Sequence, residues 1–180
     1  MAVKKKKTIE WLMSKYSWFF DDFKLNEIEI LDRFTQYKDK QSDSVEDFFW
    51  SILNYLLIES AKNAQEVVEY YNKSEKIYLV MVHFRWDYEK QPSNKLHKLW
   101  VENRMHLNIE QSNLDINFKI SAGNDCIASK SIDGKIISKE IALKNETIPY
   151  DECSRVLGCT CMMIAIPKKD LNGRLVRKKE

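Results

Sequence analysis

Turn-forming residues are scarce in this chain, which has four glycines and three prolines among its 180 residues. Glycine and proline supply most tight turns, so a chain with so few of them favours long helices over a sandwich of many short strands. The length fits one domain, or two small subdomains that share a core. Hydrophobic residues make up 44% and charged residues 31%, the composition of an ordinary folded protein. A folded, helix-rich protein is therefore expected.

Apolar residues recur at spacings of three and four through the first part of the chain. This spacing places the apolar residues on one face of a helix and predicts helices over 9–23 and 25–37. A third helix, opened by a capping box and kinked in its middle, is expected from Asp43 to about Asn72. Its aromatic stripe is interpreted as core rather than as a ligand groove. Residues 1–74 are therefore predicted to form a helical region.

The pattern is mixed after that point. β-branched and aromatic residues are concentrated over 76–84, which predicts a strand, with a buried helix as the alternative. A helix is expected from Pro92 to about Leu107, and apolar and polar residues alternate over 116–120, which is strand spacing. Residues 75–180 are therefore predicted to form an α+β region.

Short segments with glycine turns begin at Ser121. The Asp133-Gly134 dipeptide predicts a tight turn. A short strand is expected over 135–137, one or two helical turns over 139–144, and a final strand over 161–166.

The four cysteines all lie in the last third of the chain, at Cys126, Cys153, Cys159 and Cys161. Clustered thiolates can satisfy the tetrahedral preference of Zn²⁺, which binds sulfur at about 2.3 Å in closed structural sites. We therefore predict that these cysteines hold one structural zinc ion. The fold class is then α+β, with a helical N-terminal part and a small zinc-stapled strand-and-turn C-terminal segment. Reduced thiols without metal, or a redox or nucleophilic role, are the alternatives.

Glycines stand close to two of these cysteines. The turn Gly123-Asn124-Asp125 can present backbone N–H groups to a sulfur, and Gly158 lets the backbone bend tightly before Cys159. Ser129, a poor zinc ligand, stands where a Cys-x-x-Cys knuckle would place its second cysteine.

The three histidines, His83, His97 and His106, do not form a metal pair at i, i+4 spacing, and we interpret them as structural or surface residues. A cysteine-dependent enzyme would need His83 or His106 as the base for a Cys126 nucleophile. The sequence has no phosphate-binding glycine loop, no zinc-protease motif and no nucleophile elbow. A non-catalytic protein is therefore the leading expectation.

Several motifs between Ser121 and Pro167 occur together in the same segment of a known group of proteins. They are the turn Asp133-Gly134-Lys135, the pair Ile148-Pro149 ahead of Cys153, and the closing Gly158-Cys159-Thr160-Cys161. This segment resembles the cysteine-bearing C-terminal segment of phage head-morphogenesis (minor head) proteins and similar uncharacterised bacterial proteins. In that pattern Ser129 replaces the second cysteine and Thr160 replaces an arginine. The resemblance implies a small metal-binding module at 121–167 and a phage or prophage origin.

Charge and hydropathy limit the expected partners and location. The net charge of +2 gives no global argument for nucleic acid, but the basic ends, at Lys4–Lys7 and over 168–179, can contact phosphates or an acidic partner. No signal peptide and no apolar run long enough to span a bilayer are expected, which places the protein in the cytoplasm. The predicted function is a non-catalytic, zinc-stabilised interaction or assembly protein with an unidentified protein partner. A cysteine-dependent enzyme or redox protein and a nucleic-acid-binding accessory protein are the alternatives.

Overall fold

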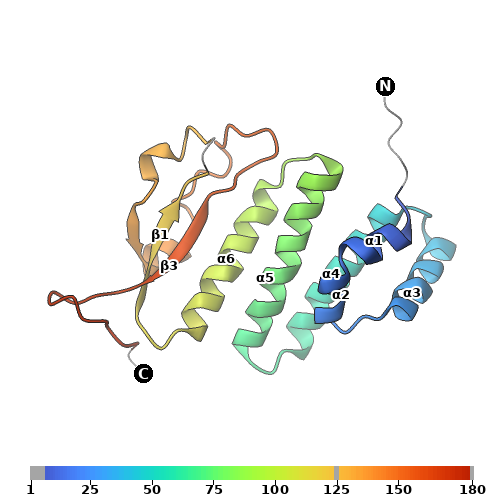
Figure 1. Cartoon of the computed structure of the whole chain (residues 1–180), viewed down its shortest axis with the longest axis horizontal. Helices are drawn as coiled ribbons and strands as arrows, with labels where there is room; N and C mark the ends of the chain where they lie inside the picture. The colour runs from blue at the N-terminus through green and yellow to red at the C-terminus, as the bar shows by residue number, and fades with distance from the viewer. Residues whose placement is uncertain (1–6, 124–125, 179–180) are drawn as a thin grey trace. The chain divides into compact units, whose positions relative to one another are not determined.

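The computed structural model describes residues 7–123 and 126–178 of the chain. Helices are followed by a small three-stranded antiparallel sheet, which confirms the predicted α+β fold with a helical N-terminal part (Figure 1). In chain order the elements are α1 (Ile9–Lys15), α2 (Ser17–Asp22), α3 (Glu27–Lys40), α4 (Val45–Asn63), α5 (Val67–His83), the π-helix η1 (Phe84–Glu89), α6 (Asn94–Gln111), β1 (Ile116–Ser121), the 3₁₀ turn η2 (Lys130–Ile132), β2 (Ile136–Ser138), α7 (Lys139–Leu143) and β3 (Met162–Pro167).

The chain divides into two compact units, Met1–Ile58 and Glu59–Glu180, and the division falls within α4. Residue 74, where the sequence predicts the boundary, lies inside α5. The C-terminal unit therefore contains a pair of long helices as well as the sheet and all four cysteines. Among the described residues, no helix combines the length and the apolar character that crossing a bilayer requires.

Aromatic side chains form the core of the N-terminal unit. The ring of Phe49, on α4, lies 4.7 Å from the ring of Tyr16 and 6.0 Å from that of Phe20, measured between centroids. Phe34 and Phe48 make a second contact at 5.0 Å. The aromatic stripe of α4 thus serves as core, as the sequence indicates.

The N-terminal helices differ from the prediction at their boundaries. The helix expected over 9–23 is divided at Tyr16, which leaves helical geometry while its ring packs into the core. α4 begins at Val45, and the Ser44 hydroxyl accepts the N–H of Asp47 at 3.1 Å as an N-terminal cap. The kinked helix predicted to start at Asp43 is in fact two helices, α4 and α5.

The strand predicted over 76–84 is wrong, because these residues form the second half of α5 and the start of η1. Ile77, Val80, Met81 and Phe84 are all buried, at spacings of three, one and three residues. This is the buried-helix alternative. Packing against α6 decides between the two structures here, and it overrides the β propensity of the composition.

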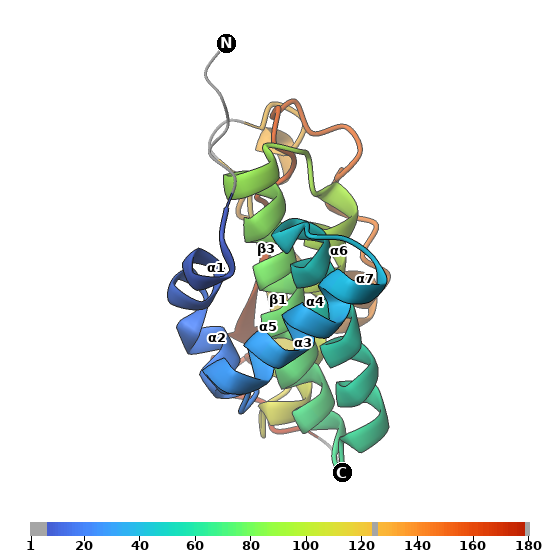
Figure 2. The ribbon, with the colours of Figure 1, turned by 90° about the vertical axis from the view of Figure 1, so that its right-hand side faces the viewer.

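In the C-terminal unit α5 and α6 lie side by side, and the sheet packs beside α6 (Figure 1). In the view of Figure 2 the sheet lies behind these two helices. The sheet has the order β2-β1-β3, and Phe118 of β1 pairs with Ile137 of β2 and Ala165 of β3. These strands, α6 and α7 lie within a few residues of their predicted positions, so these predictions are confirmed. The buried face of the sheet and of α6 forms one core with three cysteines: Trp100, Val101, Met105, Ile116, Phe118, Ile120, Ile137, Met163, Cys126, Cys159 and Cys161.

Candidate functional site

The four cysteines are carried by the segments that connect the strands. Cys126 follows β1, while Cys153 and Cys159 lie in the long loop after α7, and Cys161 immediately precedes β3. Cys126, Cys159 and Cys161 are fully buried, Cys153 is partly buried, and all four are free of disulfides. Two loops that are distant in sequence therefore contribute to one buried site.

The four thiols lie near one another, and we call this set the thiol ring. Each influences the ionisation of its neighbours: Cys126 and Cys153, Cys153 and Cys159, Cys159 and Cys161, and Cys161 and Cys126. The structure thus brings all four predicted site residues together. Sulfur ligands of one tetrahedral Zn²⁺ lie about 3.8 Å apart, so mutual contact between thiols is a requirement for sharing such an ion.

Backbone N–H groups donate to sulfurs of the thiol ring. The N–H of Gly123 donates to Cys161 Sγ at 3.5 Å, and the N–H of Cys161 donates to Cys159 Sγ at 3.4 Å. Asn124 and Asp125, the rest of the turn that the sequence singles out, lie outside the described residues. Hydrogen bonds to sulfur favour the thiolate, which is the form that binds metals.

Ser129 is fully buried beside the thiol ring. Its Oγ is hydrogen-bonded to Cys161 Sγ at 3.1 Å, and its hydroxyl donates to the backbone oxygen of Cys126 at 3.4 Å. The position that a second knuckle cysteine would occupy therefore faces the sulfurs, but it contributes a hydrogen-bonding group.

The thiol ring stabilises thiolates at two of its positions. The pKa of Cys161 is lowered, chiefly by the hydrogen bond with Cys159, while that same bond and burial raise the pKa of Cys159. For Cys126, burial has the largest single effect on the pKa and acts to raise it. Hydrogen bonds from Ser129 and Cys153 act together in the other direction, so the pKa is lowered. The pKa of Cys153 is raised, mainly by burial. A lowered pKa favours the thiolate, which is the form that binds a divalent cation.

Helix α6 holds the loop that carries Cys159 and Cys161. The N–H of Cys159 donates to Asn94 Oδ1 at 2.8 Å, and His97 Nε2 lies 2.7 Å from the carbonyl oxygen of Cys161. His97 is fully buried, and this burial lowers its pKa, so the neutral ring donates through Nε2. His97 is thus a structural residue, one of the two roles that the sequence indicates.

The other two histidines lie away from the thiols. His106 stacks on Tyr71, with 4.6 Å between ring centroids, and His83 stacks on Trp86 at 6.0 Å. Within the described residues neither histidine contacts Cys126. The geometry therefore gives no support to a histidine base for a Cys126 nucleophile.

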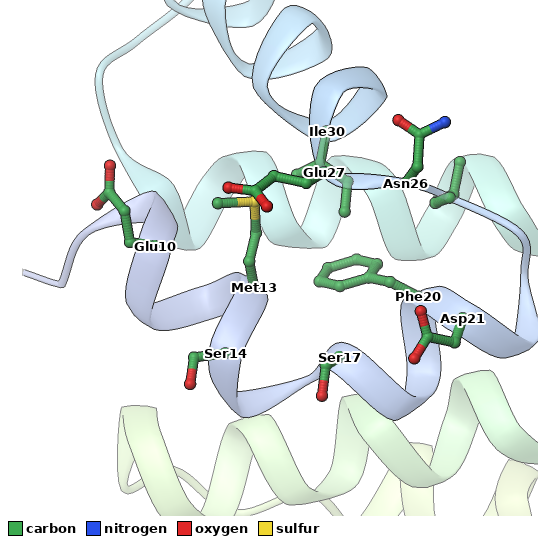
Figure 3. A pocket seen from close by; sticks show the side chains of 10 residues that line it. Glu10, Met13, Ser14, Ser17, Phe20, Asp21, Asn26, Glu27 and Ile30 are labelled. Atoms are coloured by element: carbon green, nitrogen blue, oxygen red, sulfur yellow. The ribbon is translucent and has the colours of Figure 1, made fainter.

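A separate hollow lies in the N-terminal unit between α1, α2 and α3. Figure 3 shows the side chains of Met13 and Phe20 directed toward α3, with carboxylates around them. The described residues that line the hollow include no Lys, Arg or His; its apolar and acidic members are Met13, Phe20, Leu25, Ile30, Glu10, Asp21 and Glu27. The lining contains no Cys and no His, and among the described residues its carboxylates form no grouped set of metal ligands, so the thiol ring is the stronger candidate site.

The thiol ring stops short of a formed metal centre. Among the described residues, no group of three or more His, Cys, Asp and Glu side chains is arranged so that it could hold a metal ion. No family model, curated protein or solved structure matches the chain. The resemblance of residues 121–167 to phage head-morphogenesis proteins therefore stays a prediction.

Proposed function

We propose that the chain is a non-catalytic interaction or assembly protein whose C-terminal unit is stabilised by one structural zinc ion. The proposed ligands are Cys126, Cys153, Cys159 and Cys161. The observation that carries the proposal is the thiol ring, which joins two loops of little regular structure. A closed set of four sulfurs suits Zn²⁺, and binding energy at such a site contributes directly to folding.

Burial supports a structural ion over a catalytic one. Three of the four proposed ligands are fully buried, and a catalytic zinc site keeps one position open to water or substrate. Zinc binding would require the sulfurs to move toward a common centre. Cys153 has the most room to move, because it is the one partly exposed cysteine and lies in a loop.

Replacement of single cysteines tests the zinc site. Each Cys→Ser variant is expected to bind less Zn²⁺ than the wild type and to unfold at a lower temperature, and a chelator should lower the unfolding temperature of the wild type alone. Ser131→Ala is the matched control, since Ser131 is an exposed residue of the same segment. Unchanged unfolding of the wild type on adding chelator would contradict the site.

Exposed apolar side chains on the two cysteine loops support an interaction role. Ile127 is 74% exposed and Val156 is 88% exposed, and the N–H of Ile127 donates to Ser154 Oγ at 3.4 Å, which ties the loops together. A photo-crosslinking residue at position 127 or 156 is expected to give one discrete product with a partner protein in native extract. Position 131 is the control, and equal labelling from all three positions would argue against a defined partner.

Thiol chemistry is the second candidate function. The observation in its favour is the lowered pKa of Cys161, caused mainly by the hydrogen bond with Cys159. It predicts that one thiol of the metal-free protein is alkylated far faster than the others near neutral pH. Slow, uniform alkylation of all four thiols would exclude it.

A phage or prophage origin belongs to the proposal as well. It is supported by the resemblance of residues 121–167 to phage head-morphogenesis proteins. Genes for phage structural proteins are expected beside the gene for this chain, and neighbours without any such gene would count against that origin.

A further inference from the structure

After β3 the chain forms a two-stranded arm over residues 168–178, drawn in dark red in Figure 1. The N–H of Asp170 donates to the carbonyl of Arg174 at 2.9 Å, and the N–H of Val176 donates to that of Lys168 at 3.0 Å. Lys169 pairs with Leu175 between these bonds. The arm is therefore a short hairpin over 168–176, and its last residues pair with 113–115 at its base, where Arg177 lies opposite Leu114.

The turn at the tip of the arm is held by one carboxylate. Asp170 Oδ1 accepts the N–H of Asn172 at 2.8 Å and that of Arg174 at 2.9 Å, and Gly173 has the positive φ of 77° that the turn requires. Leu171 is fully exposed at this tip. A defined turn therefore presents an apolar side chain to solvent.

Two cations of the arm hold its base. Lys168 Nζ lies 3.0 Å from Asp115 Oδ2, while Lys178 Nζ donates to the carbonyl of Ile109 at 3.2 Å and lies 3.8 Å from Glu110 Oε2. These contacts fix the start and the end of the arm to the unit that carries the sheet.

Three other cations of the arm are exposed and uncompensated. Within the described residues the side chains of Lys169, Arg174 and Arg177 make no ion pair or hydrogen bond. Asp170 is the one acidic residue between positions 168 and 178, and its carboxylate holds the turn. The arm therefore concentrates positive charge on both of its strands.

We propose that this arm binds double-stranded DNA, a function beyond the proposed zinc-stabilised role. The major groove of B-DNA, about 12 Å wide, admits a two-stranded β ribbon. Lys169, Arg174 and Arg177 would contact phosphates on the walls of the groove, and Leu171 would reach base edges at the tip. An acidic protein partner would neutralise the charges, but it would not account for a paired ribbon with an apolar tip.

The test is the fluorescence anisotropy of a labelled duplex of about 20 base pairs, titrated with full-length protein at about 50 to 200 mM salt. Wild-type affinity is expected to fall steeply as salt rises. The variant Lys169→Gln/Arg174→Gln/Arg177→Gln should bind more weakly, with a slope of log affinity against log salt reduced by about 2 to 3, since each phosphate contact on duplex DNA contributes about 0.9.

The matched control removes the same net charge elsewhere. Lys24, Lys38 and Lys40 are exposed residues of the N-terminal unit, and their replacement by Gln should leave the salt slope unchanged. Circular dichroism of both triple variants verifies folding, and Leu171→Ser should weaken binding without a change in slope.

Several results would overturn the proposal. One is no binding by the wild type at the lowest salt, and another is an equal loss in the control variant. A third is loss of binding on replacing Lys4–Lys7 while the arm variant still binds. Displacement of the duplex by polyglutamate at an equal charge concentration would instead identify an acidic protein as the partner.

Discussion

The Nε2 atom of His97 lies 2.7 Å from the carbonyl oxygen of Cys161, so a side chain of α6 holds the backbone between the thiol ring and β3. The His97 ring also packs near Trp100, at 5.3 Å between centroids, and near Trp86 and Tyr150, at 5.8 and 6.0 Å. Because the ring is fully buried, this contact links the helical pair to the cysteine loop in the interior of the unit.

Replacing His97 should therefore destabilise the C-terminal unit. His97→Ala is expected to lower the free energy of unfolding by about 2 to 4 kcal/mol, because it removes a buried ring and leaves the Cys161 carbonyl unpaired. His106→Ala is the control, since His106 is only partly buried and should cost less than about 1 kcal/mol. Urea unfolding measures both, and equal losses would refute the special role of His97.

Ser129 provides a test of the polar environment of the thiol ring. Ser129→Ala removes the hydroxyl bonded to Cys161 Sγ and to the Cys126 carbonyl. Stability should fall by about 1 kcal/mol. Zinc affinity, measured by competition with a chromophoric chelator, should fall by about 10- to 100-fold, as for other groups that orient metal ligands. The variant Ser131→Ala, at an exposed position, should keep the stability and the zinc affinity of the wild type. An unchanged zinc affinity in Ser129→Ala would show that Ser129 plays no part in metal binding.

Substitutions at Gly158 and Gly173 allow the stability cost of backbone strain to be measured apart from the cost of a steric clash. Both have positive φ, 97° and 77°, but a Cβ on Gly158 would lie 2.5 Å from Asn94 Oδ1, whereas one on Gly173 would meet nothing within 4 Å. Gly173→Ala should cost about 1 kcal/mol through strain alone. Gly158→Ala should cost about 1 to 3 kcal/mol more, because it also displaces the amide that accepts the Cys159 N–H. Thermal unfolding that shows equal costs would contradict this close approach.

The base of the arm should respond to acid. The hydrogen bond from Lys168 holds the pKa of Asp115 below its ordinary value of 3.8, so the folded state favours the carboxylate. The ion pair therefore contributes fully above this ordinary value, and its contribution is lost as pH falls through the lowered folded pKa. The amide chemical shift of Lys168, whose N–H donates to the carbonyl of Asp115, should change in that acid range. Asp115→Asn should remove this change, and an identical titration in the variant would contradict the role of Asp115.

Regular sequence patterns predicted most of the elements in this chain. β1 follows from strict alternation, which describes a single buried face, and α6 follows from Pro92 and the apolar residues after it at helical spacing. Residues 76–84 misled the prediction, since a dense apolar run suits a strand and a buried helix equally. Only the packing against α6, a long-range contact, decides between them.

The sequence was enough to predict the four candidate ligands, but not the residues that hold their loops in place. Cysteines confined to one part of a chain suggest a shared site, and Ser129 was noticeable because it lies three residues after Cys126. Asn94 and His97 carried no such signal. They act on Cys159 and Cys161 across 65 and 64 residues, through a tertiary contact that no local pattern encodes.

Elemental analysis of freshly purified protein, without added chelator and with a count of reactive thiols, tests the zinc site most directly. About one zinc per chain with thiols protected from reagent is the expected result. Protein without metal and with four freely reactive thiols would contradict the site. Thiol chemistry at the same cysteines would then be the better account of what this chain does.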